Sequence, residues 1–247
     1  MTTTQSAPSG TRTTAIDPSA GAARRMRRPA LVAGSGLLAM AVLAPAARFG
    51  VIQRLVTPGD ATRTAGHILA SAGLFRLAIA ALTAVVILDV VVAWALLKFF
   101  EPVHKGLATL AAWLRISYAA IFAVAVSQLM GVLPLLSNAR HLTALSISHR
   151  QAEALLKIQG FQDIWKASLI VFGLYLVLLG YLACRSGYVP RLLGVLLVIA
   201  GGGYLIDSIA GLLSPSYTAS VSSFTFIGEA LFMLWLLLKG RKIALTA

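Results

Sequence analysis

The sequence predicts an all-α, polytopic integral membrane protein built as a bundle of six transmembrane helices. Hydrophobic residues make up 58% of the 247 residues and charged residues only 12%, whereas soluble domains carry about 25% charged residues. The apolar residues gather in six runs, each close to or above the roughly 20 residues that a helix needs to cross a bilayer. Strict alternation of apolar and polar residues, the pattern of a transmembrane β-barrel, does not occur. Because lipid offers the backbone no hydrogen-bond partners, each run is expected to be helical.

Residues 1–28 are predicted to form a disordered, basic N-terminal tail. Residues 1–22 are rich in Thr, Ser, Ala, Gly and Pro without a hydrophobic period, so they have little apolar surface to bury. The first apolar run, Pro29–Ala47, would cover about 28 Å as a helix. Its Ala44-Pro45-Ala46 leaves two interpretations open, a signal peptide with a cleavage site or an uncleaved span. The long preceding tail and the later spans favour the uncleaved span.

Five further apolar runs complete the predicted transmembrane domain, residues 29–240, and residues 241–247 form a short cytoplasmic tail. These runs are Leu74–Leu97, Leu107–Leu133, Trp165–Cys184, Leu192–Leu213 and Val221–Leu238. Two connections contain structure of their own. Asp60 is expected to cap a short helix over Ala61–Ser71, and the mixture of leucines and polar residues from Asn138 to Gly160 is consistent with a helix lying on the bilayer surface.

The formal net charge of +13 suggests nucleic acid as a partner, but the positions of the basic residues predict orientation instead. With a cytoplasmic N-terminus, twelve basic residues lie on the inside and six on the outside, which fits the positive-inside rule. The inside residues are Arg12, Arg24, Arg25, Arg27, Arg28, Lys98, Lys105, Arg185, Arg191, Lys239, Arg241 and Lys242, and the outside residues are Arg48, Arg54, Arg63, Arg140, Arg150 and Lys157. We therefore expect a bacterial inner-membrane protein with both termini in the cytoplasm.

The basic group Arg24, Arg25, Arg27 and Arg28 lies directly before the first span. A basic group at this place is typical of a topology signal and of contact with anionic lipid. Aromatic residues are not interleaved with the arginines, as they would be in a surface that stacks nucleic-acid bases. The sequence thus favours the lipid bilayer as partner and argues against nucleic acid.

Several motifs in the second half of the chain resemble an uncharacterised bacterial membrane family, domain of unknown function 4386. They are Gly173-Leu174-Tyr175, Leu-Gly-Tyr-Leu at 179–182, Arg185 through Gly194, and Gly203-Tyr204-Leu205-Ile206-Asp207, with further matches at Pro58-Gly59-Asp60, Leu74-Phe75-Arg76-Leu77, Leu88-Asp89, Glu101-Pro102-Val103 and Gly228-Glu229. The resemblance covers about residues 30–240 and implies a polytopic membrane protein with no assigned reaction. Two departures are Tyr175, where the family often has His, and His104-Lys105, where it tends to have Asn-Arg.

The candidate functional residues are charged side chains inside the predicted spans, because each costs roughly 2.5–3.5 kcal/mol at mid-bilayer. Their depth proposes two pairs, Asp89 with Arg115, and Asp207 with either Arg76 or Lys166. Glu229 lies near the centre with no basic residue at its depth, which would favour its neutral, protonated form. We take Glu229, Asp207, Asp89, Arg115 and Arg76 as substrate- or proton-binding candidates. The structural alternative is that the pairs fix helix register and that Glu229 is hydrogen-bonded to a hydroxyl such as that of Tyr204.

Other features restrict the chemistry. The single cysteine, Cys184, excludes an internal disulfide and a Cys-rich zinc site, and all four histidines lie outside the spans. No catalytic residue, cofactor or metal is predicted, and a membrane enzyme is the least favoured class. Gly201-Gly202-Gly203, with Gly194 and Gly211, favours close helix packing over a broken helix, and a homo-oligomer through such faces is compatible with it. The leading hypothesis is a small transporter or permease-like protein; the alternative is a non-enzymatic scaffold or accessory subunit.

Overall fold

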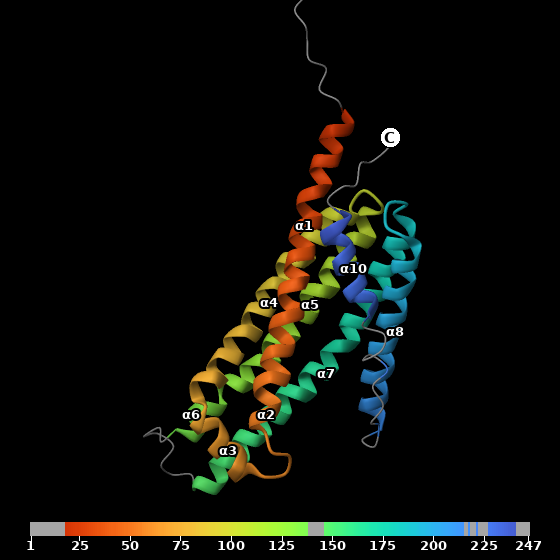
Figure 1. The fold of residues 1–247 in the computed structure, drawn as a ribbon. Helices are drawn as coiled ribbons and strands as arrows, with labels where there is room; N and C mark the ends of the chain where they lie inside the picture. Colours follow the sequence, from red (N-terminus) through yellow and green to blue (C-terminus); the bar gives the residue numbers. More distant parts are fainter. Residues whose placement is uncertain (1–17, 138–145, 215–216, 218–220, 222–226, 241–247) are drawn as a thin grey trace, which may run out of the picture.

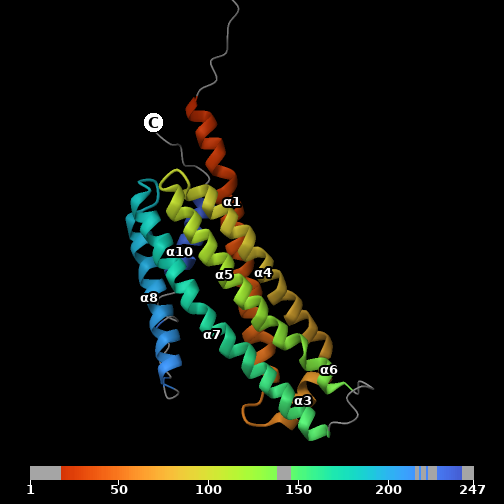
Figure 2. The same cartoon turned by 180° about the vertical axis from the view of Figure 1, so that it is seen from behind.

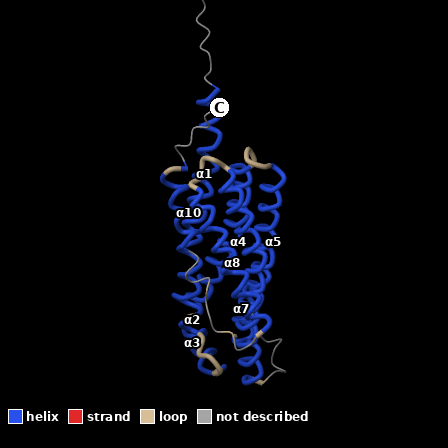
Figure 3. Tube along the Cα trace, turned by 90° about the vertical axis from the view of Figure 1, so that its right-hand side faces the viewer, coloured by secondary structure: helices blue, strands red, loops and turns tan. Residues whose placement is uncertain are grey.

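Six long helices follow one another in alternating directions. The computed structural model describes residues 18–137, 146–214, 217, 221 and 227–240, with side chains from residue 27 onward. The long helices are α1 (Pro18–Pro45), α4 (Ala72–Phe100), α5 (Lys105–Met130), α7 (Ile147–Arg185), α8 (Arg191–Leu213) and α10 (Ile227–Leu238). Over these residues Figure 3 shows helices and loops only. The predicted all-α bundle is confirmed.

Within the described ranges, five segments are long and apolar enough to cross a bilayer by length and composition, and α10 is apolar but shorter. The five are Arg27–Leu55, Ala72–Phe100, Lys105–Leu136, Ile147–Arg185 and Arg191–Leu213. The sixth predicted span, Val221–Leu238, is described as a helix from Ile227 onward, and 222–226 lie outside the described residues, as does the predicted tail at 241–247.

The long helices close into a ring. Each packs against its neighbour in the sequence, α1 on α4, α4 on α5, α5 on α7, α7 on α8 and α8 on α10, and α10 packs back on α1. In Figure 1 the start of α1, the connection between α4 and α5, the connection between α7 and α8, and the end of α10 lie at one end of the bundle. We call this the terminal end. The opposite end carries the short helices α2 (Gln53–Leu55), α3 (Ala61–Ala70) and α6 (Val132–Leu136).

The first helix is longer than the predicted first span. It begins at Pro18 rather than near Pro29 and continues past Pro45 as a π-helix, Ala46–Ile52, and then as α2. Residues 18–28 of the predicted tail are therefore helical, while 1–17 lie outside the described residues. Pro45 has no N–H and its ring clashes with the preceding turn, which explains why the α-helical pattern widens directly after it. Ala44-Pro45-Ala46 thus lies inside a continuous helix that packs on α4.

The opposite end corrects one expectation. Residues 147–160 do not form a separate helix on the bilayer surface; they are the first part of α7, a single helix of 39 residues, and 138–145 lie outside the described residues. Figure 2 shows α7 running the length of the bundle, from the short helices α3 and α6 to the terminal end beside α8. A helix of this length covers about 58 Å, so its first turns extend beyond a hydrocarbon core of about 30 Å.

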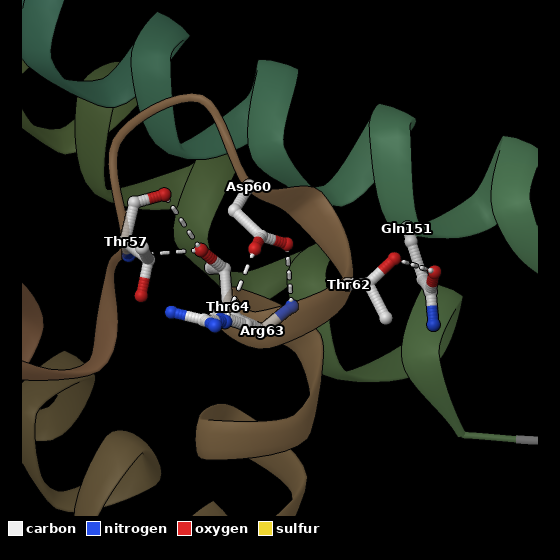
Figure 4. A network of polar contacts seen from close by, with 6 residues as sticks. All are labelled: Thr57, Asp60, Thr62, Arg63, Thr64 and Gln151. Atoms are coloured by element: carbon white, nitrogen blue, oxygen red, sulfur yellow. Dashed lines mark hydrogen bonds and ion pairs between the residues drawn. The ribbon is translucent and has the colours of Figure 1, made fainter.

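Polar contacts order the turn before helix α3, and one of them joins α3 to α7 (Figure 4). The Asp60 carboxylate accepts a hydrogen bond from the Arg63 N–H at 2.9 Å, which confirms the predicted cap. The Thr64 hydroxyl accepts from the Thr57 N–H at 2.9 Å and closes the turn before the helix. The Thr62 hydroxyl donates to Gln151 of α7 at 3.1 Å.

Two pairs of glycines bring α7 and α8 into backbone contact. Gly173 and Gly180 of α7 lie seven residues apart, as do Gly194 and Gly201 of α8, and the helices are antiparallel. A Cβ at Gly201 would lie 2.6 Å from the carbonyl oxygen of Gly173, and one at Gly194 would lie 2.7 Å from that of Gly180. Only glycine permits this approach, so close packing is confirmed at Gly194 and Gly201. Gly202 and Gly211 face open space.

The interior of the ring contains two apolar cores, one at each end. The core at the terminal end includes Val92, Ala111 and Leu179, and the core at the opposite end includes Val85 and Tyr118. Met40 and Phe172 pack against both cores. The level between the two cores is therefore where the intramembrane charges of α4 and α5 must lie, since Asp89 falls between Val85 and Val92 and Arg115 between Ala111 and Tyr118.

We predict that replacing Gly201 by Ala lowers the melting temperature of the purified protein in detergent. The added Cβ would force α7 and α8 apart, at a cost of about 1–3 kcal/mol for overpacking. The matched control is Gly202→Ala, whose Cβ would meet nothing within 4 Å, and which should leave stability unchanged or raise it slightly because alanine favours a helix over glycine. Tryptophan fluorescence during heating measures both, and equal melting temperatures for the two variants would contradict the close contact.

Candidate functional site

A buried ion pair lies at the centre of the bundle. Arg115 Nη2 of α5 is 2.7 Å from Asp89 Oδ1 of α4, and the two side chains are 2% and 0% exposed. The tight connection between the helices explains their equal depth: Asp89 lies 12 residues before Glu101, and Arg115 lies 11 residues after His104. At 1.5 Å per residue, both are about 17 Å from that connection. The pair predicted from depth is confirmed.

The Arg115 guanidinium is also held by helices α7 and α1. Nη1 donates a hydrogen bond to the Tyr175 hydroxyl at 2.8 Å, and Nη2 contacts the Met40 sulfur at 3.8 Å. The guanidinium lies over two rings, with its carbon 5.0 Å from the centroid of Tyr175 and 5.8 Å from that of Phe172. A planar cation that stacks and donates at once is a role that arginine fills and lysine does not.

Glu229 approaches the same centre from α10. Its carboxylate interacts electrostatically with Arg115, with Asp89 and with the hydroxyl of Tyr204 on α8, but it forms no ion pair with Arg115 among the described residues. Tyr204 in turn packs its ring against Phe172, with centroids 5.4 Å apart. Tyr204, the neighbour expected for Glu229, is close enough to interact with it, but Glu229 Oε1 accepts no hydrogen bond from the described residues. All six helices of the ring supply a residue to this cluster, which we call the central cluster: Met40, Asp89, Arg115, Tyr175, Tyr204 and Glu229.

The central cluster contains buried polar atoms that the described residues do not satisfy. They include Asp89 Oδ2, Arg115 Nε and Glu229 Oε1. Asp89 Oδ1 touches the guanidinium without the alignment of a hydrogen bond, so the contact is mainly ionic. Leaving a buried polar group unpaired costs about 1–3 kcal/mol, and more where the group is charged. A cluster selected for stability alone would be expected to pair these atoms.

The second predicted pair does not form. Asp207 Oδ1 accepts hydrogen bonds from the Tyr217 hydroxyl at 2.8 Å and from the Val221 N–H at 2.9 Å. In the described part of the chain, the exposed side chains of Arg76 and Lys166 form no ion pair. The hydrogen bond to Asp207 raises the pKa of Tyr217, as expected when a phenol donates to an ionised carboxylate. Asp207 therefore binds Tyr217 and Val221, and Arg76 lies away from the central cluster.

Aromatic side chains seal the central cluster on the side away from the terminal end. Tyr118 packs at a tilt against Phe172 with centroids 4.8 Å apart and stacks on Phe122 at 6.0 Å, and Phe122 meets Trp165 at 5.9 Å. The column ends where the Arg48 guanidinium lies 3.9 Å from the centre of the Trp165 ring. Such ring contacts and cation–π pairs each contribute about 0.5–1.5 kcal/mol. This side of the cluster is therefore packed by aromatic rings.

On the side toward the terminal end, Tyr175 borders a small apolar cavity between α4, α5 and α7. Small alanine side chains of α5 form one wall, and larger side chains of α4 and α7 form the others. The lining residues are Ala93, Leu96, Phe100, Ala108, Ala111, Ala112, Tyr175, Leu179 and Leu182. The cavity is small and apolar, and it lies within the packed core at the terminal end.

Sequence reasoning found three members of the central cluster and missed others. Asp89, Arg115 and Glu229 stand out as charges in apolar runs, and Tyr204 could be proposed as a neighbour of Glu229. Tyr175 was missed as a site residue because a tyrosine in an apolar helix is ordinary; its one signal was that the resembled family often has His there. Met40 of the cluster, and Phe172 beside it, carry no charge, and nothing in their sequence context distinguishes them from lipid-facing residues.

We predict that Tyr175→Phe destabilises the protein by about 1–3 kcal/mol, because it leaves the Nη1 donor of Arg115 buried without its acceptor. Tyr175→His should lie closer to the wild type, since a neutral imidazole nitrogen can accept the same hydrogen bond. The matched control is Tyr181→Phe on the same helix, where the ring is 45% exposed. Unfolding in detergent mixtures measures the three, and an effect of Tyr175→Phe no larger than that of Tyr181→Phe would show that the hydrogen bond contributes nothing.

Comparison with known proteins relates the chain to a family and to one curated relative. A protein of Archaeoglobus fulgidus described as an uncharacterized protein is 38% identical over 160 residues, which cover 65% of this chain and 82% of that protein. No solved structure matches. The family model described as Domain of unknown function (DUF4386) matches residues 32–240, which include all six residues of the central cluster. The chain belongs to this family.

Proposed function

We propose that the protein is a small membrane transporter of the permease type, with the central cluster as its substrate- or proton-binding site. The observation that carries the proposal is the set of orphaned polar atoms on two carboxylates and one guanidinium in the middle of the bundle. Ionisable groups inside a membrane bundle usually mark ion or substrate pathways. A solute or proton that binds there would satisfy atoms that the described side chains leave unpaired.

The position of the cluster between the two halves of the ring supports this proposal. Helices α1, α4 and α5 supply Met40, Asp89 and Arg115, and helices α7, α8 and α10 supply Tyr175, Tyr204 and Glu229. In many transporters the binding site lies near the bilayer midplane where two halves meet, and one half rocks against the other. Here such a movement would act on the hydrogen bond from Arg115 to Tyr175, because Arg115 and Asp89 belong to the same half.

The alternative is a non-enzymatic scaffold or accessory subunit. It is favoured by the burial of the ion pair and its tyrosine, since Asp89, Arg115 and Tyr175 are at most 2% exposed. In this alternative the pair fixes the register of α4 against α5, a role attested for buried polar groups in helical bundles. The two functions differ in whether Glu229 is needed for any movement of solute.

We predict solute-dependent currents from proteoliposomes on a solid-supported membrane when small amino acids, sugars or organic cations are applied in turn. For a solute that gives a current, Glu229→Gln should reduce it by about tenfold or more, because the substitution removes the ionisable group. The matched control is Asp163→Asn, which removes an exposed carboxylate from α7. Wild-type currents equal to those of empty liposomes for all solutes would favour the scaffold.

We also propose that the protein lies in the cell membrane with its terminal end on the cytoplasmic side. In this orientation, anionic lipid is contacted by Arg24, Arg25, Arg27 and Arg28. The basic residues support this orientation. Lys98, Lys105, Arg185, Arg191 and Lys239 flank the helix ends at the terminal end, in short connections of the kind that determine topology. The side chains of Arg24 and Arg25 lie outside the described residues.

This orientation predicts opposite labelling of two single cysteines. In a Cys184→Ala background, Ala152→Cys on the first turns of α7 should react with a membrane-impermeant maleimide on intact cells. Pro102→Cys, in the connection between α4 and α5, should react only after permeabilisation. Both positions are exposed, so a difference reports sidedness rather than burial. Labelling of Pro102→Cys on intact cells, with Ala152→Cys protected, would reverse the proposed topology.

A further inference from the structure

We propose that the central cluster holds one exchangeable proton, shared between the carboxylates of Asp89 and Glu229. The proposal rests on the proposed function, which it deepens by naming the proton as the ion that the transporter would couple to. It is carried by the count of charges in the cluster and by the carboxylate oxygens that are buried without a hydrogen-bond partner. Both are independent of whether any solute moves.

The ionisable groups of the cluster include one more acid than base. The groups that face it are Asp89 from α4, Arg115 and Tyr118 from α5, Tyr175 from α7, Tyr204 from α8 and Glu229 from α10, and α1 contributes the uncharged Met40. With neutral tyrosines, one guanidinium faces two carboxylates. A net charge of −1 in a packed, apolar interior is strongly unfavourable. One bound proton removes it.

The geometry favours a proton over a metal ion. The pair and its tyrosine are almost completely buried, and the aromatic column closes one side. In the described ranges no group of three His, Cys, Asp or Glu side chains could hold a metal ion. A proton needs no coordination shell, and a protonated carboxyl group gains a donor. The free oxygens, Asp89 Oδ2 and Glu229 Oε1, are the atoms on which it can reside.

Sharing the proton gives the cluster two arrangements with the same total charge. With the proton on Glu229, Asp89 is the counterion of Arg115, as the 2.7 Å contact shows. In the other arrangement the O–H bond on Glu229 breaks and one forms on Asp89, so that Glu229 becomes the counterion. Glu229 lies on α10 and Asp89 on α4, so the transfer moves the negative charge that balances Arg115 from a helix of its own half to a helix of the other half. This is the kind of two-state element that coupled transport requires.

Infrared spectroscopy of the full-length protein in lipid nanodiscs tests the proposal, because a protonated carboxyl group gives a carbonyl band that an ionised one lacks and that shifts in D2O. At neutral pH we expect the wild type to show the band of one protonated carboxyl group, and Glu229→Gln to lose it. Asp89→Asn should also lose it, because one remaining carboxylate is balanced by Arg115. Arg115→Gln should show two, and the control Asp207→Asn should retain one.

The Asp89→Asn spectrum distinguishes sharing from simple burial. If burial alone kept Glu229 neutral, the band would persist in Asp89→Asn, and the proposal would be overturned. A wild type without the band, or a band that remains in Glu229→Gln, would overturn it as well. Glu229→Gln and Asp89→Asn test the proposal independently. If one variant does not fold, as judged by size-exclusion chromatography, the spectrum of the other still decides.

The outcome is separable from that of the transport experiment. The expected band pattern without any solute-dependent current would mean that the cluster binds its proton in a protein that does not transport the tested solutes. A current that depends on Glu229, without the band, would mean that transport stands and that the shared proton is wrong.

Discussion

The structure depends on how one arginine is accommodated in the middle of an apolar bundle. Arg115 cannot release its charge in a protein, and it cannot reach the interface because two packed cores enclose it. Its guanidinium must therefore be satisfied where it lies, by Asp89 from the neighbouring helix and by Tyr175 from across the ring. These requirements fix the relative depth of α4, α5 and α7. A shift of one helical turn in any of them would separate the groups by about 5 Å.

The close approach of α7 and α8 brings the second half of the ring to the same centre. Because Gly173 meets Gly201 at backbone distance, Tyr204, three residues after Gly201, is carried in toward Phe172 and Glu229. Gly228 plays the corresponding part on α10, since a Cβ there would lie 2.6 Å from the carbonyl oxygen of Leu196 on α8. Small residues thus decide which polar residues meet, although they take no part in the chemistry themselves.

The residue of greatest functional interest is the carboxylate that this scaffold does not require. Asp89 is enough to balance Arg115, and a purely structural bundle would have no need of Glu229 at the same level. An acid that adds an uncompensated charge is costly to retain, and such costs are commonly found at sites that bind or move ions.

The sequence by itself determined the all-α membrane class, the place of the long spans, the depth of the ionisable residues and the pair of Asp89 with Arg115. The spans can be predicted from the sequence because lipid forces the backbone of each apolar run to be helical. The depth of a residue in the bilayer can be predicted because the rise per residue of a helix is constant. Only the tertiary structure decided that Asp207 binds Tyr217 and Val221 instead of Arg76, that Tyr175 completes the arginine site, and that residues 147–160 extend α7. Each of these outcomes depends on the rotation of one helix about its axis or on contacts across the ring, and depth along a span carries no information about either.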